Sequence, residues 1–158
     1  MKSDVSDSGD MERLANLAKE KFGKIDVLFA NAGIMPGSSM SELKVKDWMD
    51  MGEINIRGTL NSMAAVLPEF LARKKGHIII TSSMAGLKTI PGNAVYCSTK
   101  HFVRAMLESF RAESIMEGTN IRTTTLYPGA VKTELLNTIE PDAVAYAVLY
   151  AISQPTLG

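Results

Sequence analysis

The sequence predicts an α/β fold in which a doubly wound parallel sheet is covered by helices on both faces. Three short apolar segments are rich in β-forming residues, and longer segments with helical periodicity lie around and between them. The resulting order of helix, strand, helix, strand, helix, strand, helix is typical of parallel strands joined by right-handed helical crossovers. With 158 residues, the chain is long enough for one domain with its own core.

The first two elements are a helix over 10–22 and a strand over 25–30. Apolar residues recur at helical spacing from Met11 to Phe22, and Gly23 follows as a helix stop. The strand is a short run of β-forming residues from Ile25 to Ala30. Continuous apolar strands of this kind are typical of a sheet buried on both faces.

The second helix is predicted over 46–73 and is followed by a strand over 77–81. Its periodicity is long but imperfect, because Gly52 or Gly58 is expected to break it and Pro68 to kink it. The strand, which begins at His77, contains three consecutive isoleucines.

The third helix is predicted over 94–117, ending at Gly118, and a third strand over 120–127. Pro141 suits the first position of a last helix over 142–152, because proline fixes a helical φ and lacks only an N–H that would be unpaired there.

Composition favours a cytoplasmic protein that binds neither nucleic acid nor membrane. Seventeen basic residues balance seventeen acidic ones, with no basic cluster beyond a short run at a helix end. Cys97 is the single cysteine, which is typical of a reducing compartment. The first ten residues are too polar for a signal peptide, and no apolar run has the length of a membrane span. Neither His77 nor His101 has a second ligand at metal spacing, so we expect no metal site.

Tyr96 and Lys100 are the residues most indicative of chemistry. They lie four positions apart on a predicted helix, so both project from one face. A nearby ammonium favours the phenolate, so we expect it to lower the pKa of the tyrosine from about 10 and make it a general acid and base. Such a pair alone is weak support, because this spacing is common on helix surfaces.

Further motifs follow the predicted strands. Asn31-Ala32-Gly33 follows the first, Ser82-Ser83 the second and Pro128-Gly129 the third. Ligands of open α/β sheets bind at the carboxyl ends of strands, so these motifs lie where a site is expected.

Together these motifs resemble those of the short-chain dehydrogenase/reductase family. Asn-Ala-Gly, Asn-x-x-Gly, Ser-Ser-x-Ala-Gly, Tyr-x-x-x-Lys and Pro-Gly-x-x-x-Thr appear in family order over essentially the whole chain. The resemblance implies a partial Rossmann-like sheet and an oxidoreductase. The implied reaction is hydride transfer between NAD(P)(H) and a small alcohol or carbonyl compound.

The resemblance also implies the catalytic residues. Tyr96 would exchange a proton with the substrate oxygen, while Lys100 would lower its pKa and hold the nicotinamide ribose. Ser83, thirteen positions before Tyr96, matches the serine that hydrogen-bonds the substrate carbonyl, and Ser82 is one position off. Asn55 resembles the residue that helps to hold a water in the proton relay.

The cofactor implied is NADP or NAD. The residues that would contact it are Asp4, Val5, Asn31, Ala32, Gly33, Tyr96, Lys100, Pro128, Gly129, Val131 and Thr133.

The sequence departs from the family pattern at both ends. It contains no glycine-rich Thr-Gly-x-x-x-Gly-x-Gly turn, the element that holds the cofactor pyrophosphate in family members. The residues that select NAD or NADP lie in the same amino-terminal part of those proteins. The stretch 133–141 is shorter than the family's substrate lid. We therefore expect residues 1–158 to be a single partial domain, the catalytic half, that binds cofactor weakly and turns over slowly, if at all. The substrate is not specified.

Two alternatives remain at this stage. One is a non-catalytic remnant that associates with homologous subunits, or with itself, through the helices over 46–73 and 94–117. The other is a relative of nucleoside-sugar epimerases, which share Tyr-x-x-x-Lys, although the Asn-Ala-Gly and Pro-Gly segments fit dehydrogenases better.

Overall fold

The computed structural model describes residues 1–129 and 140–155, and its centre is a parallel sheet of three strands in the order β1-β2-β3. The strands are β1 Val27–Ala30, β2 Gly76–Thr81 and β3 Ile121–Leu126. Ala30 lies opposite Ile80, which in turn lies opposite Thr125, so all three strands end at one edge. The predicted α/β fold with a parallel sheet is confirmed.

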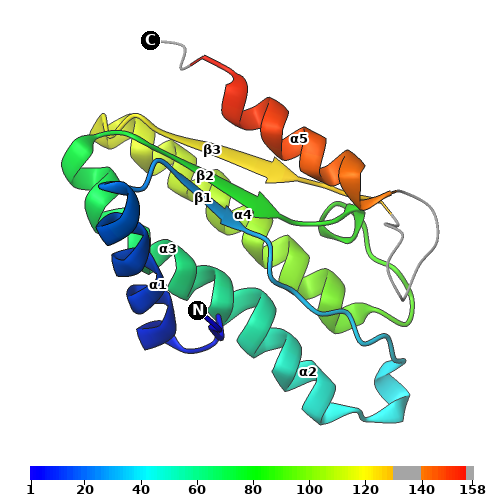
Figure 1. Ribbon diagram of the computed structural model, residues 1–158. Helices are drawn as coiled ribbons and strands as arrows, with labels where there is room; N and C mark the ends of the chain where they lie inside the picture. The colour runs from blue at the N-terminus through cyan, green and yellow to red at the C-terminus, as the bar shows by residue number, and fades with distance from the viewer. Residues whose placement is uncertain (130–139, 156–158) are drawn as a thin grey trace.

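Helices cover both faces of this sheet (Figure 1). On one side lie α1, α2, α3 and α4, and on the other lies α5. Their bounds are α1 Ser8–Phe22, α2 Val45–Met51, α3 Gly58–Arg73, α4 Ala94–Glu117 and α5 Pro141–Ser153. Gly23 and Gly118 end α1 and α4 with positive φ, and Pro141 begins α5, as the sequence predicts.

The long helical segment predicted over 46–73 is interrupted where two glycines lie. Residues Gly52–Arg57 form a π-helical segment between α2 and α3, so the break begins at Gly52 and ends before Gly58. Pro68 lies inside α3 and does not end it. Single π-helical turns are frequent at functional sites, and this one contains Asn55.

The core lies between the sheet and the helices α3 and α4. Phe70 of α3 and Ile78 of β2 are fully buried there, together with Val103 and Leu107 of α4. A Cβ on Gly76 would lie 2.3 Å from the Phe70 ring, so the close approach of α3 to β2 requires glycine. This core fixes α3 and α4 on the sheet and thereby positions the ends from which the site is built.

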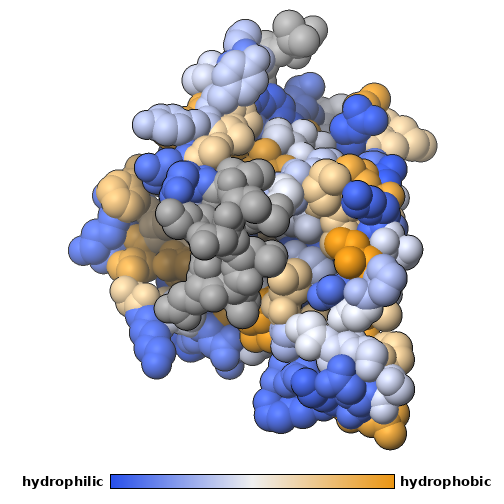
Figure 2. Space-filling model, turned by 90° about the vertical axis from the view of Figure 1, so that its right-hand side faces the viewer, coloured by the Kyte–Doolittle hydropathy of each residue, from blue (hydrophilic) through white to orange (hydrophobic). Residues whose placement is uncertain are grey.

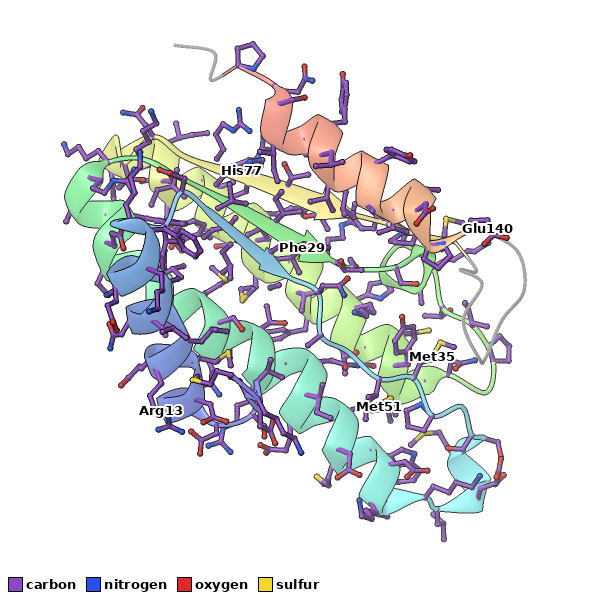
Figure 3. The ribbon with its side chains drawn as sticks, in the orientation of Figure 1. Arg13, Phe29, Met35, Met51, His77 and Glu140 are labelled. Atoms are coloured by element: carbon purple, nitrogen blue, oxygen red, sulfur yellow. The ribbon has the colours of Figure 1, made fainter. Side chains whose placement is uncertain are left out.

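The outer flank of β1 is open. Within the described residues β1 pairs only with β2, and Phe29 projects from it partly exposed (Figure 3). An apolar hollow of about 380 Å³ lies between α1, β1 and α3. Within the described residues, the edge of β1 that faces away from β2 is thus unpaired. None of the helices in 1–129 and 140–155 combines the length and apolarity needed to cross a bilayer.

Candidate active site

The amino-terminal half of α4 brings Tyr96 and Lys100 together at the carboxyl end of β2. Lys100 is only 5% exposed, and its Nζ donates a hydrogen bond to the carbonyl oxygen of Thr81, 2.9 Å away. The same Nζ lies 5.7 Å from the centroid of the Tyr96 ring. The ammonium therefore lies over the tyrosine ring and beside the end of the strand, a cation–π arrangement.

Burial lowers the pKa of Lys100 from 10.5 to about 8, because desolvation disfavours the charged form. At neutral pH the group still carries its proton. An ammonium has three protons to donate, and within the described residues the only acceptor in hydrogen-bond contact with it is the Thr81 carbonyl.

The pKa of Tyr96 differs from the expectation that Lys100 would lower it. Burial of the phenol raises the pKa above 10, and a hydrogen bond with the Ser83 side chain lowers it by a smaller amount. The ammonium of Lys100 faces the ring and gives its hydrogen bond to Thr81 rather than to the phenol oxygen. In this arrangement Tyr96 is held in its protonated form.

The structure distinguishes the two neighbouring serines. Ser83 Oγ accepts a hydrogen bond from the backbone N–H of Ala85 at 3.1 Å and also interacts with the Tyr96 side chain. Ser82 is buried, and its hydroxyl donates to the carbonyl oxygen of Lys100 at 3.0 Å. Ser83 therefore interacts with the tyrosine, while Ser82 ties the strand end to α4.

Gly86 permits this close packing, a requirement the sequence analysis did not identify. It ends the short 3₁₀ turn Met84–Gly86, which packs on α4. A Cβ here would lie 2.4 Å from Ser82 Oγ and 2.7 Å from the Lys100 carbonyl oxygen. The last position of the Ser-Ser-x-Ala-Gly motif was the feature of the sequence that could have indicated this requirement for glycine.

Asn55 connects three segments around the site. Its Oδ1 accepts from the Ile34 N–H at 2.8 Å, and its Nδ2 donates to the Ile34 carbonyl at 2.9 Å and to Thr99 Oγ1 at 3.1 Å. Its own carbonyl oxygen accepts a hydrogen bond from Thr59 Oγ1 at 2.8 Å. The side chain thus joins the loop after β1 to α4, and sequence reasoning did not anticipate its partners Ile34, Thr59 and Thr99.

The Asn31-Ala32-Gly33 turn lies against the same residues. Asn31 Oδ1 accepts a hydrogen bond from Thr81 Oγ1 at 2.9 Å, which ties the ends of β1 and β2 together. A Cβ on Gly33 would lie 3.3 Å from Asn55 Oδ1 and 3.4 Å from Lys100 Nζ. Gly33 therefore leaves an open cradle beside the ammonium.

Asp4 and Val5 line a hollow of about 470 Å³ together with Ala32 and Ile54. Hydrogen bonds from the backbone N–H and the hydroxyl of Ser6 hold the pKa of Asp4 below its usual value. Val5 packs on Gly58, where a Cβ would lie 2.5 Å from the Val5 side chain. The amino-terminal segment is thus fixed against the start of α3, on the side where the Asn31 turn lies.

The segment after β3 completes the part of the site that can be described. The Pro128 carbonyl oxygen accepts a hydrogen bond from the Met84 N–H at 3.0 Å, so this segment adjoins Ser83. Gly129 is exposed, and the predicted cofactor residues Val131 and Thr133 lie outside the described residues. In residues 1–129 and 140–155 no group of three or more His, Cys, Asp or Glu side chains could hold a metal ion.

Comparison with known proteins gives consistent similarities. The family model of short chain dehydrogenases matches residues 1–143. An oxidoreductase of Listeria monocytogenes, described as uncharacterized, is 51% identical over 172 residues, which cover 98% of this chain and 69% of the relative. That stretch is longer than the 158 residues of this chain, so the alignment includes positions of the relative with no counterpart here.

Solved structures agree with this assignment. Serine dehydrogenase from Escherichia coli superimposes with a TM-score of 0.87 at 32% identity, covering 97% of this chain and 68% of its own. The closed form of serine dehydrogenase complexed with NADP⁺ gives a TM-score of 0.90 at 29% identity, with 99% and 70% covered. Motifs, fold and sequence similarity thus agree, and the chain belongs to the short-chain dehydrogenase family of oxidoreductases.

Proposed function

We propose that this site transfers a hydride between a nicotinamide cofactor and an alcohol or carbonyl compound, with Tyr96 exchanging the proton. The observation that carries the proposal is the convergence of Ser83 and Lys100 on Tyr96 at the carboxyl end of β2. The family membership and the NADP⁺ complex of serine dehydrogenase support the same chemistry.

The described residues fit a nicotinamide cofactor. Lys100 is a buried ammonium with further protons to donate, and it adjoins the cradle left by Gly33, where a ribose hydroxyl could accept them. The hollow lined by Asp4, Val5 and Ala32 adjoins the same turn and is suited to the adenosine part. The full proposed set is Asp4, Val5, Asn31, Ala32, Gly33, Tyr96, Lys100, Pro128, Gly129, Val131 and Thr133. NADP is the cofactor favoured by the serine dehydrogenase complex, and NAD is the alternative.

The protein's own groups supply the proton chemistry. When bound, the nicotinamide ring gives or takes the hydride. In carbonyl reduction, the Ser83 hydroxyl and the Tyr96 phenol donate hydrogen bonds to the carbonyl oxygen. Negative charge develops there as the carbon receives the hydride, and the phenol proton passes to it to form the alcohol. The Lys100 ammonium then stabilises the phenolate that Tyr96 becomes.

Asn55 has a positioning role in this proposal. Both ends of its side-chain amide are hydrogen-bonded to Ile34 and Thr99, so it holds the loop after β1 and α4 at a fixed separation. We further propose that residues 1–158 act as one cytoplasmic domain, which the balanced charge and the single cysteine support.

Titration with NADPH and NADH, following nicotinamide fluorescence, tests the proposal directly. We expect a saturable signal, with a dissociation constant weaker than micromolar because the sequence contains no glycine-rich phosphate turn. Carbonyl reduction above background that disappears in Tyr96→Phe would complete the support. A chain shown to be folded by circular dichroism that binds neither nucleotide would refute the proposal.

A second candidate function is association with homologous subunits without catalysis. The observation that favours it is exposed apolar surface: Ile115 and Met116 at the end of α4, and Tyr146, Leu149 and Tyr150 on α5, are all largely exposed. Mixing this chain with a longer family member and detecting mixed dimers by native mass spectrometry would support it. Exclusively monomeric chain together with nucleotide binding would favour the enzyme.

A further inference from the structure

The segment that joins Ser83 to Tyr96 exposes an unusual run of large apolar side chains. Met84 is 40% exposed, Leu87 47% and Ile90 39%. Ser83 and Tyr96, which flank the segment, both belong to the proposed proton-transfer group, and each of the three side chains lies within six positions of one of them along the chain. Exposed apolar groups beside a polar site are typical of a ligand-binding surface.

Backbone hydrogen bonds shape the segment that carries these side chains. Met84–Gly86 forms a 3₁₀ turn, and the Leu87 N–H donates to the Met84 carbonyl at 3.0 Å. Leu87, which caps the turn, lies three positions after Met84, the spacing at which side chains of a 3₁₀ helix are eclipsed. A second i to i+3 hydrogen bond joins the Asn93 N–H to the Ile90 carbonyl at 3.1 Å.

Backbone hydrogen bonds join this segment to the other two loops of the site. The Met84 N–H bonds the Pro128 carbonyl after β3, and the Ser38 N–H bonds the Gly92 carbonyl at 2.9 Å, which ties in the loop after β1. Figure 3 shows Met35 of that loop at the same end of the molecule as the first turn of α4. Figure 2 faces this end and shows hydrophobic groups gathered in patches among hydrophilic ones.

Apart from the buried Lys100 ammonium, charge is sparse in the loop segments around these side chains. In the described segments 31–39, 83–96 and 126–129, Lys88 is the only charged residue. A site that recognises a carboxylate or an ammonium group requires a partner of opposite charge, because an unpaired charge against apolar side chains loses its hydration without compensation. These segments supply the exposed apolar side chains of Met84, Leu87 and Ile90 and one exposed lysine.

We propose that the substrate carries an uncharged alkyl or aryl group that packs against Met84, Leu87 and Ile90, which makes it an apolar ketone or secondary alcohol. This inference rests on the proposed hydride-transfer function and narrows it. We expect serine and other charged hydroxy compounds to be poor substrates of this chain.

A matched pair of ketones tests the proposal. The ketone 2-octanone and the keto acid 7-oxooctanoate have the same chain and differ in a terminal methyl or carboxylate. We expect kcat/KM with NADPH to favour 2-octanone by about tenfold or more, a preference of the size that apolar pockets give. In parallel, saturation-transfer NMR should show 2-octanone, and not 7-oxooctanoate, in contact with the protein.

Variants test whether the preference for 2-octanone depends on the apolar side chains of this segment. Replacing Met84 and Leu87 together (Met84→Gln, Leu87→Gln) should abolish the preference, whereas Lys88→Gln on the same loop, which removes a cation and no apolar surface, should not reduce it. Equal or faster turnover of 7-oxooctanoate, or a preference that survives the double variant, would overturn the inference while leaving hydride transfer intact. If 2-octanone binds, its binding depends on Met84 and Leu87, and no turnover is detected, the apolar site would be upheld and the proposed hydride transfer refuted. Binding of neither ketone would overturn the inference.

Discussion

The two ends of the sheet each bury a basic side chain, and the two side chains differ in charge at neutral pH. Lys100 at the carboxyl end and His77 at the amino end are both 5% exposed, and burial lowers the pKa of each. Lys100, with a pKa of about 8, stays charged at neutral pH, whereas His77, with a pKa of about 4, stays neutral. Equal burial thus gives a charged group at the proposed reaction centre and a neutral one in the scaffold.

The difference in charge follows from the ordinary pKa values, 10.5 for the lysine and 6.5 for the histidine, because burial lowers both by a similar amount. The hydrogen-bond partners of the two side chains differ as well. Arg122 donates to His77 Nδ1 at 2.8 Å, which leaves Nε2–H to donate to Thr124 Oγ1 at 2.8 Å, so both ring nitrogens are satisfied in the neutral form. Arg122 also donates to the carbonyls of Ala151 and Gln154, at the negative end of the α5 dipole. Figure 3 shows His77 next to that end of α5. The amino end is a completed network, whereas at the carboxyl end the Lys100 ammonium has one hydrogen-bond acceptor among the described residues, the Thr81 carbonyl oxygen.

The largest expected effect is loss of activity when the proton donor is removed. Tyr96→Phe should lower kcat for carbonyl reduction by about 1,000-fold, within the range of general acid catalysis, because the phenyl ring fills the same space without a transferable proton. Steady-state kinetics with NADPH measures this, and circular dichroism should show an unchanged fold. Retention of more than a tenth of the rate would remove Tyr96 from its proposed role.

The next largest effect concerns Lys100, for which we expect the catalytic rate and the free energy of unfolding to change in opposite directions. Lys100→Met should lower the rate by about 100-fold and yet raise the free energy of unfolding by about 1–2 kcal/mol. The buried charge costs at most about 3 kcal/mol at neutral pH, at about 1.4 kcal/mol per pKa unit, and the lost bond to Thr81 offsets about 1 kcal/mol.

Urea denaturation of Lys100→Met and of Lys88→Met, a matched change of an exposed lysine, measures the stability change. The folded pKa of Lys100 lies below its unfolded value, so the unfolded state binds more protons between pH 8 and 10.5, and the native protein should gain stability as pH rises through that window. A variant less stable than the parent would contradict the view that this charge is held at a cost.

At the amino end, acidification should destabilise the protein by about 2 kcal/mol between pH 6.5 and 4. The unfolded state takes up a proton on His77 near pH 6.5, while the folded state resists until about pH 4, so stability falls as pH falls through this window. Urea midpoints across that range measure the slope. His77→Gln should flatten it, and His101→Gln serves as the control; an unchanged slope in His77→Gln would contradict the assignment.

The smallest effect tests the attachment of α5. Arg122→Lys keeps the charge but loses the planar guanidinium that reaches His77, Ala151 and Gln154 at once, so we expect a loss of about 1 kcal/mol. Hydrogen exchange of α5 should become faster while the exchange of α4 stays unchanged. Equal protection of α5 in both proteins would show that the apolar contacts of α5 suffice.

Local pattern predicted most of this fold, and contacts between distant segments explain what it missed. The bounds of α4 and the strand positions follow from periodicity and from the stops at Gly118 and Gly23. The raised pKa of Tyr96 was missed because it depends on burial, which three-dimensional packing decides. The bonds that join Asn55 to Ile34 and Thr99 span 21 and 44 positions, and no local pattern contains them.

The π-helical segment Gly52–Arg57 makes the site sensitive to the deletion of a single residue between α2 and α3. A π-helical turn holds one residue more than an α-helical turn, so a deletion of one residue here would allow α2 and α3 to join as a single regular helix. Each residue of an α-helix turns by about 100°, so the helix before the deletion would rotate by about that angle relative to α3. The Asn55 amide would then point away from Ile34 and Thr99. The hydrogen bonds that position the loop after β1 against α4 would be lost, although every side chain of the site would still be present.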